Sequence, residues 1–275
     1  MKPLKAEFRF ERDMAHIARQ WMTEQELMTK AEFYTPWGVC DLVGISLEQS
    51  RVQQRLGLGQ RLAVGPLLRV EILARVPDVE EGASISFKRL ERLYRGSLPA
   101  GELRTHLDSL VNGNFLRINT RGAYQKVNGW APLHKRIVAL ELKLRRVEEA
   151  LGQALSHFAF AEESFVGLPA RVAERVVNSN RARRFKSSGV GIISIGPDGC
   201  AVLLPSEPRT KANPVFQMHC VERFWRTRAK GNSASTAGRY VQAALPSFLP
   251  AEAQGDSYPR HKPMTTAGIE RAPAR

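Results

Sequence analysis

Cysteine is scarce in this sequence, and the few that occur lie far apart. Cys40, Cys200 and Cys220 have neither the close spacing of a structural zinc site nor the density of a small disulfide framework. A chain without disulfides is typical of a reducing compartment. We therefore expect a cytoplasmic protein.

Long apolar runs are also missing. No stretch approaches the roughly 18 uninterrupted apolar residues of a transmembrane helix, and the first residues, MKPLKAEFRFERDM, lack the apolar centre of a signal peptide. The sequence has no internal repeat that would indicate a solenoid or a propeller. We expect a soluble protein with no membrane partner.

Acidic residues are outnumbered by basic ones. The 275 residues include 41 Lys and Arg but only 27 Asp and Glu, which gives a formal charge of +14. This excess favours a partner with a phosphate backbone, and DNA is the simplest candidate. The alternative is that the charge serves solubility or contact with an anionic membrane. With 43% hydrophobic residues, the chain can bury one large core and a second, smaller one, so two domains are expected.

The first 50 residues predict a helix followed by two strands. Apolar residues recur at helical spacing from about residue 8 to 28, with charged residues between them. Residues 31–34 and 38–47 have the pattern of short strands on either side of the turn Thr35-Pro36-Trp37-Gly38.

Residues 66–130 predict three helices and a two-stranded ribbon. The first helix ends near Val76-Pro77, and the third ends at Asn112-Gly113. Two short strands around a turn follow the third helix. This order of elements resembles a winged helix-turn-helix, and we place such a domain at residues 60–130.

The resemblance implies that the third helix enters the major groove of double-stranded DNA and that the ribbon contacts the backbone or the minor groove. A basic cluster at residues 181–186 also suits contacts with phosphates. The candidate DNA-binding residues are Arg104, His106, Arg117, Arg121, Lys126, Arg183 and Arg184. Alternatives stay open, because many winged helices contact proteins, exposed basic residues are usually solvated, and the 181–186 cluster is also compatible with a loop.

Residues 136–144, Arg-Ile-Val-Ala-Leu-Glu-Leu-Lys-Leu, alternate in a way that favours a strand. Glu141 and Lys143 then share one face, where a strand places the carboxylate and the ammonium side by side. Asp41 interrupts an otherwise apolar strand, and its carboxylate would be costly to bury without a partner. A cation or a metal ion near Asp41 would relieve that cost.

Beyond Lys143 the sequence predicts alternating helices and strands. We expect a helix at residues 147–158, a strand at 164–168, a further helix, and a hairpin at 190–205 that turns at Pro197-Asp198-Gly199. This alternation indicates an α/β fold.

Asp41 and Glu141-Leu142-Lys143 carry a resemblance to the PD-(D/E)xK nuclease superfamily, whose motif places an acid, and then acid-x-Lys, on adjoining strands. The separation of 100 residues (141 minus 41) exceeds the family's usual spacing, and the inserted winged helix accounts for it. Cys40 stands where the motif's name has proline, which many members of the superfamily also lack. The expected fold is α/β, a restriction-endonuclease-like mixed sheet flanked by helices, with an inserted winged-helix domain.

The resemblance divides the chain into five parts. They are a first part of the nuclease core at residues 1–50, the winged helix at 60–130, the second part of the core at 131–206, a C-terminal helix at 207–230 centred on residues 215–229, and a tail at 231–275. Gly, Ser, Ala and Pro dominate the last part, and we expect it to be disordered.

By this resemblance the protein is a metal-dependent endonuclease that hydrolyses DNA phosphodiester bonds. Asp41 and Glu141 would hold Mg²⁺, with Mn²⁺ as a substitute, and Lys143 would orient the attacking water and stabilise charge on the phosphate. Glu11 and Gln153 are additional candidates for the site. Cutting both strands usually needs two active sites, so a homodimer or a partner protein is expected.

Two other functions stay open. The chain could be a regulator that binds DNA on a nuclease fold without activity, or a subunit that recruits another protein. A separate alternative is that Glu141 and Lys143 form only an exposed ion pair, which contributes little stability. The presence of all three motif residues favours the enzyme, because a degenerate core more often loses one of them.

Overall fold

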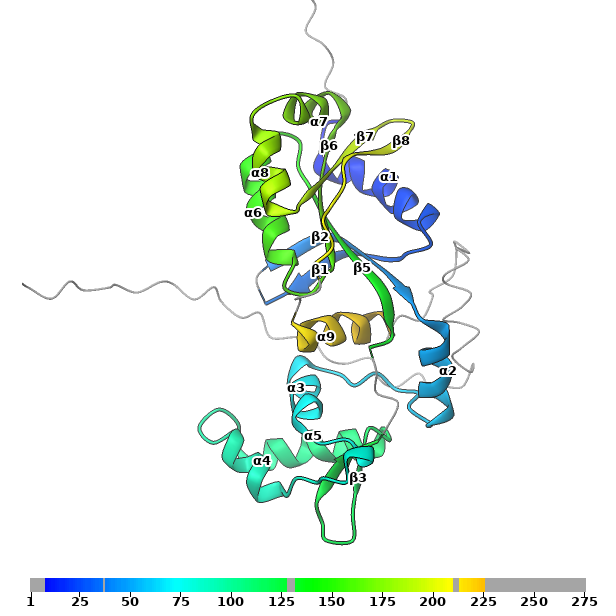
Figure 1. Cartoon of the computed structure of the whole chain (residues 1–275), viewed down its shortest axis with the longest axis vertical. Coiled ribbons are helices and arrows are strands. Elements are labelled where there is room, and N and C mark those ends of the chain that lie inside the picture. Colours follow the sequence, from blue (N-terminus) through cyan, green and yellow to red (C-terminus); the bar gives the residue numbers. More distant parts are fainter. Residues whose placement is uncertain (1–7, 37, 128–131, 210–212, 226–275) are drawn as a thin grey trace, which may run out of the picture. The chain divides into compact units, whose positions relative to one another are not determined.

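The computed structural model describes residues 8–36, 38–127, 132–209 and 213–225 (Figure 1). Contacts divide the chain into two units, Met1–Leu245 and Pro246–Arg275, and every described residue belongs to the first. The tail predicted at residues 231–275 and the last four residues of the helix predicted at 215–229 lie outside the described residues.

A six-stranded mixed sheet forms the centre of the fold. In spatial order its strands are β1 (Met28–Thr35), β2 (Gly38–Leu47), β5 (His134–Leu142), β6 (Glu163–Pro169), β7 (Gly191–Gly196) and β8 (Gly199–Leu204). The three central strands β5, β6 and β7 run parallel, whereas β1, β2 and β8 pair antiparallel with their neighbours. The expected α/β fold with a mixed sheet is confirmed.

Helices cover both faces of this sheet. They are α1 (Glu11–Glu24), α6 (Val147–His157), α7 (Ala170–Val177), α8 (Arg181–Ser188) and α9 (Pro214–Trp225), whereas α2 (Gln49–Gly57) follows the end of β2. Helix α1 packs in one apolar cluster with Phe165, whereas α6, α7 and α8 pack in another with Val166. Successive strand residues point to opposite faces, so α1 lies across the sheet from the other three helices (Figure 1).

Several boundaries differ from those predicted. The strand predicted at 136–144 is β5, His134–Leu142, and the single helix expected before the hairpin is two helices, α7 and α8. The basic cluster at 181–186 therefore lies on a helix and not in a loop. Helix α2 was not predicted, because its buried side chains are Val52 and the charged Arg55, which leave little apolar periodicity.

The elements between β2 and β5 include a second, separate core. We call residues 67–126 the α3–β4 module. It consists of α3 (Leu67–Arg75), the 3₁₀ helix η1 (Val79–Glu81), α4 (Phe87–Leu93), α5 (Ala100–Asn112) and the hairpin of β3 (Leu116–Ile118) and β4 (Tyr124–Lys126). Leu73, Leu90 and Leu107 are fully buried in its core. The predicted order of three helices and a ribbon is confirmed.

A buried ion pair fastens α2 to α9 beside this module. Arg55 on α2 has no exposed surface, and its guanidinium contacts both carboxylate oxygens of Glu222 on α9, at 2.5 and 3.0 Å. The backbone N–H of Val64, just before the module, donates to Glu222 Oε2 at 2.7 Å. The guanidinium also lies 4.3 Å from the ring centre of Trp225 and 5.2 Å from that of Phe115 in the module. Glu222 thus connects α2, α9 and the segment just before the module. Removing Arg55 or Glu222 would leave the other charge buried and unpaired.

The parallel strands pack so closely that one glycine has no room for a side chain. A Cβ atom at Gly191 on β7 would lie 2.3 Å from a ring carbon of Phe165 on β6 and 2.8 Å from the carbonyl oxygen of Leu204 on β8. The Leu204 carbonyl is backbone, so it cannot turn away as a flexible side chain would. Gly191 is therefore a packing requirement of the sheet on which the candidate site lies.

We expect Gly191→Ala to lower the free energy of unfolding by about 1–3 kcal/mol, the usual cost of overpacking a core. Gly152→Ala is the matched control, because a Cβ on Gly152 in α6 meets no atom within 4 Å. Alanine is the better helix former by up to about 1 kcal/mol, so the control should be neutral or stabilising. Urea unfolding of both variants measures the difference, and equal stabilities would contradict the packing described here.

Candidate functional site

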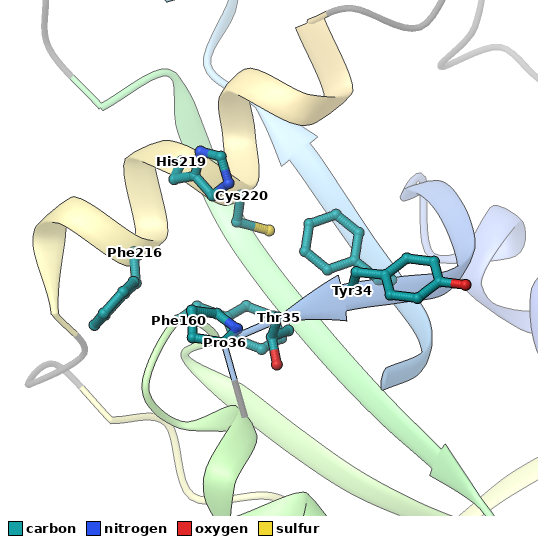
Figure 2. A pocket seen from close by; sticks show the side chains of 8 residues that line it. Tyr34, Thr35, Pro36, Phe160, Phe216, His219 and Cys220 are labelled. Atoms are coloured by element: carbon teal, nitrogen blue, oxygen red, sulfur yellow. The ribbon is translucent and has the colours of Figure 1, made fainter. Parts of the chain in front are cut away.

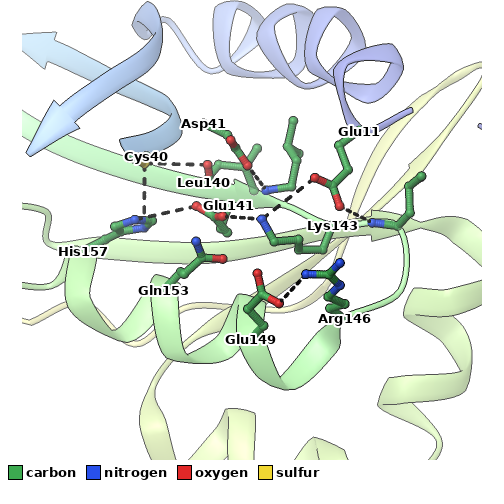
Figure 3. Close-up of polar contacts among 12 residues, drawn as sticks. Glu11, Cys40, Asp41, Leu140, Glu141, Lys143, Arg146, Glu149, Gln153 and His157 are labelled. Atoms are coloured by element: carbon green, nitrogen blue, oxygen red, sulfur yellow. Dashed lines mark hydrogen bonds and ion pairs between the residues drawn. The ribbon is translucent and has the colours of Figure 1, made fainter. Parts of the chain in front are cut away.

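Asp41 and Glu141 are brought together by the register of β2 and β5. Leu42 pairs with Leu140 in this antiparallel ladder, and extending the register by one residue places Asp41 opposite Glu141. Residues directly opposite each other in an antiparallel pair project from the same face. The Leu142 N–H donates a hydrogen bond to Asp41 Oδ2 at 2.7 Å, which fixes the carboxylate across the two strands (Figure 3).

Lys143 follows immediately after β5 and lies beside the two acids. Its backbone N–H still donates to the Gly167 carbonyl on β6, at 3.1 Å. Its ammonium group donates to Glu141 Oε1 at 2.9 Å. Glu11, at the start of α1, accepts a hydrogen bond from the Leu144 N–H at 3.2 Å and lies 3.9 Å from the Lys143 ammonium. The carboxylates of Glu11, Asp41 and Glu141 and the amine of Lys143 thus lie close together at the C-terminal end of β5 (Figure 3).

Glu141 is the most deeply buried of these acids. Its side chain is 1% exposed, and Oε2 has no hydrogen-bond partner among the described residues. Burial raises the pKa of Glu141 to about 7, and the charge of Asp41 adds to the shift. The hydrogen bond from Lys143 opposes the shift without cancelling it. The carboxylate therefore has both an unsatisfied oxygen and a strong tendency to acquire a positive partner.

The pKa values of the neighbouring groups are shifted as well. Burial raises the pKa of Asp41, although the hydrogen bond from Leu142 and the charge of Lys143 act against it. Burial alone would lower the pKa of Lys143, but the hydrogen bond to Glu141 and the surrounding negative charges raise it. Lys143 is therefore a cation at neutral pH. Shifted carboxylates grouped around one amine are typical of functional sites.

His157, which was not among the candidates from the sequence, packs against Glu141. Its Nε2 lies 3.8 Å from Glu141 Oε2, and burial lowers the pKa of His157 to about 4. The imidazole is therefore neutral at pH 7, so this contact is not an ion pair, and it is too long for a hydrogen bond. A signal for His157 does exist, because its spacing from Ala150 and Ala154 places it on the buried face of α6.

Cys40 completes this buried group on the other side of His157. Its Sγ lies 3.7 Å from His157 Nδ1 and is also in contact with the carbonyl oxygens of Leu42 and Leu140, at 3.3 and 3.8 Å. Burial, with a contribution from the Glu141 charge, raises the pKa of the thiol well above its usual value. Cys40 is thus a protonated thiol that fills the position behind the histidine, and not a nucleophile.

The two additional candidates, Glu11 and Gln153, both lie close to Glu141 and Lys143 (Figure 3). Glu11 makes the contacts described above. Gln153, one helical turn before His157 on α6, lies beside Glu141 (Figure 3). Its Oε1 is buried and accepts no hydrogen bond within the described part of the chain.

The candidate DNA-binding residues are more dispersed. Several make contacts within the protein: Arg104 lies over the Phe87 ring, Arg117 donates to the Gln125 side chain, Lys126 pairs with Asp78, and Arg184 pairs with Glu148. The Arg69 guanidinium donates to His106 Nδ1 at 3.2 Å. Burial and the Arg69 charge lower the pKa of His106, which is therefore neutral at pH 7. Arg121 and Arg183 are exposed.

A separate apolar pocket lies between the end of β1, the loop after α6, and α9 (Figure 2). Phe33, Phe160 and Phe216 form much of its lining. Burial raises the pKa of the Cys220 thiol in its wall, so this sulfur stays protonated. The residues that line the pocket include no carboxylate, and the pocket lacks the charged groups found around Glu141.

Among the described residues, no group of three or more His, Cys, Asp or Glu side chains is arranged to hold a metal ion. Within the same residues, no helix is both long enough and apolar enough to cross a lipid bilayer. Comparison with known proteins assigns no family, because no family model, no curated protein and no solved structure matches the chain.

The raised pKa of Glu141 predicts a pH dependence of stability. Because the folded protein holds this proton more tightly than the unfolded chain, the free energy of unfolding should fall as the pH rises from about 4.5 to about 7, and then level off. The contribution is at most roughly 3 kcal/mol.

Glu141→Gln should remove this part of the pH dependence. Urea unfolding of both proteins in a chelator, at several pH values across this range, isolates the contribution, because all other titrating groups are shared. Parallel curves for the two proteins would show that Glu141 titrates at an ordinary pKa.

Proposed function

We propose that the protein is a metal-dependent endonuclease that hydrolyses phosphodiester bonds in DNA. The observation that carries the proposal is the buried Glu141 carboxylate, with one oxygen unsatisfied and its pKa raised, beside Asp41 and the Lys143 ammonium. A structural ion pair does not need a second acid beside the first. Two acids that together bind a cation must lie side by side, as the half-buried Asp41 and the buried Glu141 do.

The donors present fit Mg²⁺. Glu141 Oε2 is free of hydrogen bonds within the described residues, and Asp41 is half-buried with only its Oδ2 engaged. Mg²⁺ is commonly bound by one or two carboxylates and keeps several waters, so a cluster of three protein ligands is not required. Asp41 and Glu141 would hold the ion, and Mn²⁺ would be accepted by the same oxygens. When bound, the ion would polarise a phosphate oxygen and lower the pKa of a water molecule.

The other residues of the group position and charge the site. Glu141 Oε1 accepts a hydrogen bond from the Lys143 ammonium, and Glu11 lies 3.9 Å from it. Held by these two acids, the amine would stabilise negative charge that develops on a bound phosphate. The neutral His157 ring lies beside Glu141, with its Nε2 3.8 Å from Glu141 Oε2, and both side chains are buried. A less hydrated site strengthens each of these electrostatic contacts.

Net charge and topology support DNA as the substrate. The chain carries a formal charge of +14, which favours a polyanion. We infer that the core is restriction-endonuclease-like and that the α3–β4 module acts as a winged helix-turn-helix. The module leaves after β2 and rejoins at β5, the strands that carry Asp41 and Glu141. A module tied at both ends can aim a bound duplex at the acids.

Cleavage assays test the proposal directly. Supercoiled plasmid, linear duplex and single-stranded DNA should be cut in Mg²⁺ or Mn²⁺ and remain intact in chelator. Asp41→Asn, Glu141→Gln and Lys143→Ala should each lower the cleavage rate at least about a hundredfold, as the loss of one group that stabilises a charged transition state does.

The matched controls are Glu174→Gln and Lys135→Ala. Glu174 is exposed on α7 and Lys135 is exposed on β5, and neither is among the residues grouped around Glu141. Both controls should cut within about twofold of the parent. Undiminished cutting by Glu141→Gln would mean that another site or a contaminant is responsible. A parent that binds DNA but never cuts it would instead favour a regulator on an inactive nuclease fold.

A further inference from the structure

Within the α3–β4 module, the helix expected to enter the DNA groove is poorly suited to approach phosphates. The exposed side chains of α5 include the acids Glu102 and Asp108. Its one exposed arginine, Arg104, lies with its guanidinium 4.2 Å from the ring centre of Phe87. His106 is half-buried and neutral. The solvent face of α5 therefore carries more negative than positive charge.

Helix α4 and the turn after it have the opposite character. Lys88, Arg89, Arg92 and Arg95 are all exposed. Within the part of the chain that the structure describes, none of their side chains forms an ion pair, a hydrogen bond or a ring contact. Four basic side chains thus lie close together in sequence, and within the described residues none of them is engaged in such a contact with another part of the protein.

Helical spacing places these cations on one side. Leu90 and Tyr94 are buried and turn the other side of α4 into the module's core. Arg75 on α3 donates to the Tyr94 hydroxyl at 3.0 Å, which holds the end of the helix. Lys88 and Arg92 are four residues apart, the spacing of neighbours on one helix face, and Arg95 lies in the turn just after the helix. The cationic face is therefore presented by a helix that is anchored from behind.

We propose that the face formed by Lys88, Arg89, Arg92 and Arg95 is the surface through which the module binds the sugar-phosphate backbone of DNA, while α5 stays out of the groove. This inference rests on the proposed function in naming DNA as the partner. It gives the α3–β4 module a different docking mode from the groove-reading helix expected from its element order.

Geometry and charge favour a nucleic-acid backbone as the occupant. Lys88 and Arg92 lie about 6 Å apart along the helix axis, which is close to the axial rise of two nucleotides in one strand, and Arg95 lies in the turn that follows the helix. Backbone contacts of this kind carry no base information. The module should therefore bind duplexes of different sequence with similar affinity and with a strong dependence on salt.

The test compares two triple variants in a Glu141→Gln background and in chelator. The first carries Lys88→Gln, Arg92→Gln and Arg95→Gln. The control carries Lys135→Gln, Arg19→Gln and Arg171→Gln, which removes the same charge from exposed positions on the sheet and its flanking helices. Fluorescence anisotropy with a duplex of about 25 base pairs gives the affinity at several salt concentrations.

We expect the slope of log affinity against log salt to become shallower by about 2–3 units in the first variant, since each lost phosphate contact removes about 0.9. The control should shift the slope by less than about half a unit. Thermal unfolding should confirm that both variants remain folded, because all six side chains are exposed. No cleavage step enters the measurement, so the result stands whether or not the chain proves to be a nuclease.

Three results would overturn the proposal. One is an unchanged slope in the α4 variant, which would leave its cations solvated or assign them to a protein partner. Another is an equal loss in the control, which would make the binding a property of net charge alone. The third is a larger loss from Arg104→Gln than from the α4 triple, which would place the contact on α5.

Discussion

The antiparallel register between β2 and β5 is the constraint on which the candidate site depends. It sets Asp41 across from Glu141, and a slip of one residue would move Asp41 to the opposite face of the sheet. The pairing holds although the whole α3–β4 module lies between the two strands in sequence. Buried contacts on both sides, from α1 against Leu42 and Leu140 and from α9 against Val43 and Ala139, leave the register no freedom to shift.

The same pairing explains why the acids are electrostatically unusual. A carboxylate on a central strand loses water, and a second acid opposite it makes ionisation still less favourable. Lys143 offsets only part of this cost, through one oxygen of Glu141. His157 and Cys40 fill the space on the far side with neutral groups. Around Asp41 and Glu141 the negative charges thus outnumber the positive ones, although the chain as a whole carries a formal charge of +14.

Patterns that act over a few residues were predictable from the sequence. Alternation at 136–144 indicated β5 and placed Glu141 and Lys143 on one face, and prolines and glycines marked the ends of the helices in the α3–β4 module. Contacts between distant segments were not predictable. Helix α2 is built around Arg55, whose reason for burial is Glu222 on α9, and His157 gains its place only when α6 packs against Glu141. Exposure is likewise a tertiary property, so Arg104 and Lys126 gave no sign in sequence that their side chains are engaged.

The ion pair between Arg55 and Glu222 has a consequence for the order of assembly during synthesis. Arg55 leaves the ribosome well before its partner on α9, and Asp41 leaves it long before β5. Domains generally fold from the N-terminus as the chain emerges. The α3–β4 module has its own core and can therefore fold early. Until β5 is synthesised, the edge of β2 that pairs with β5 has no partner strand. A polypeptide interrupted before β5 carries Asp41 without Glu141, and one interrupted before α9 carries Arg55 without Glu222.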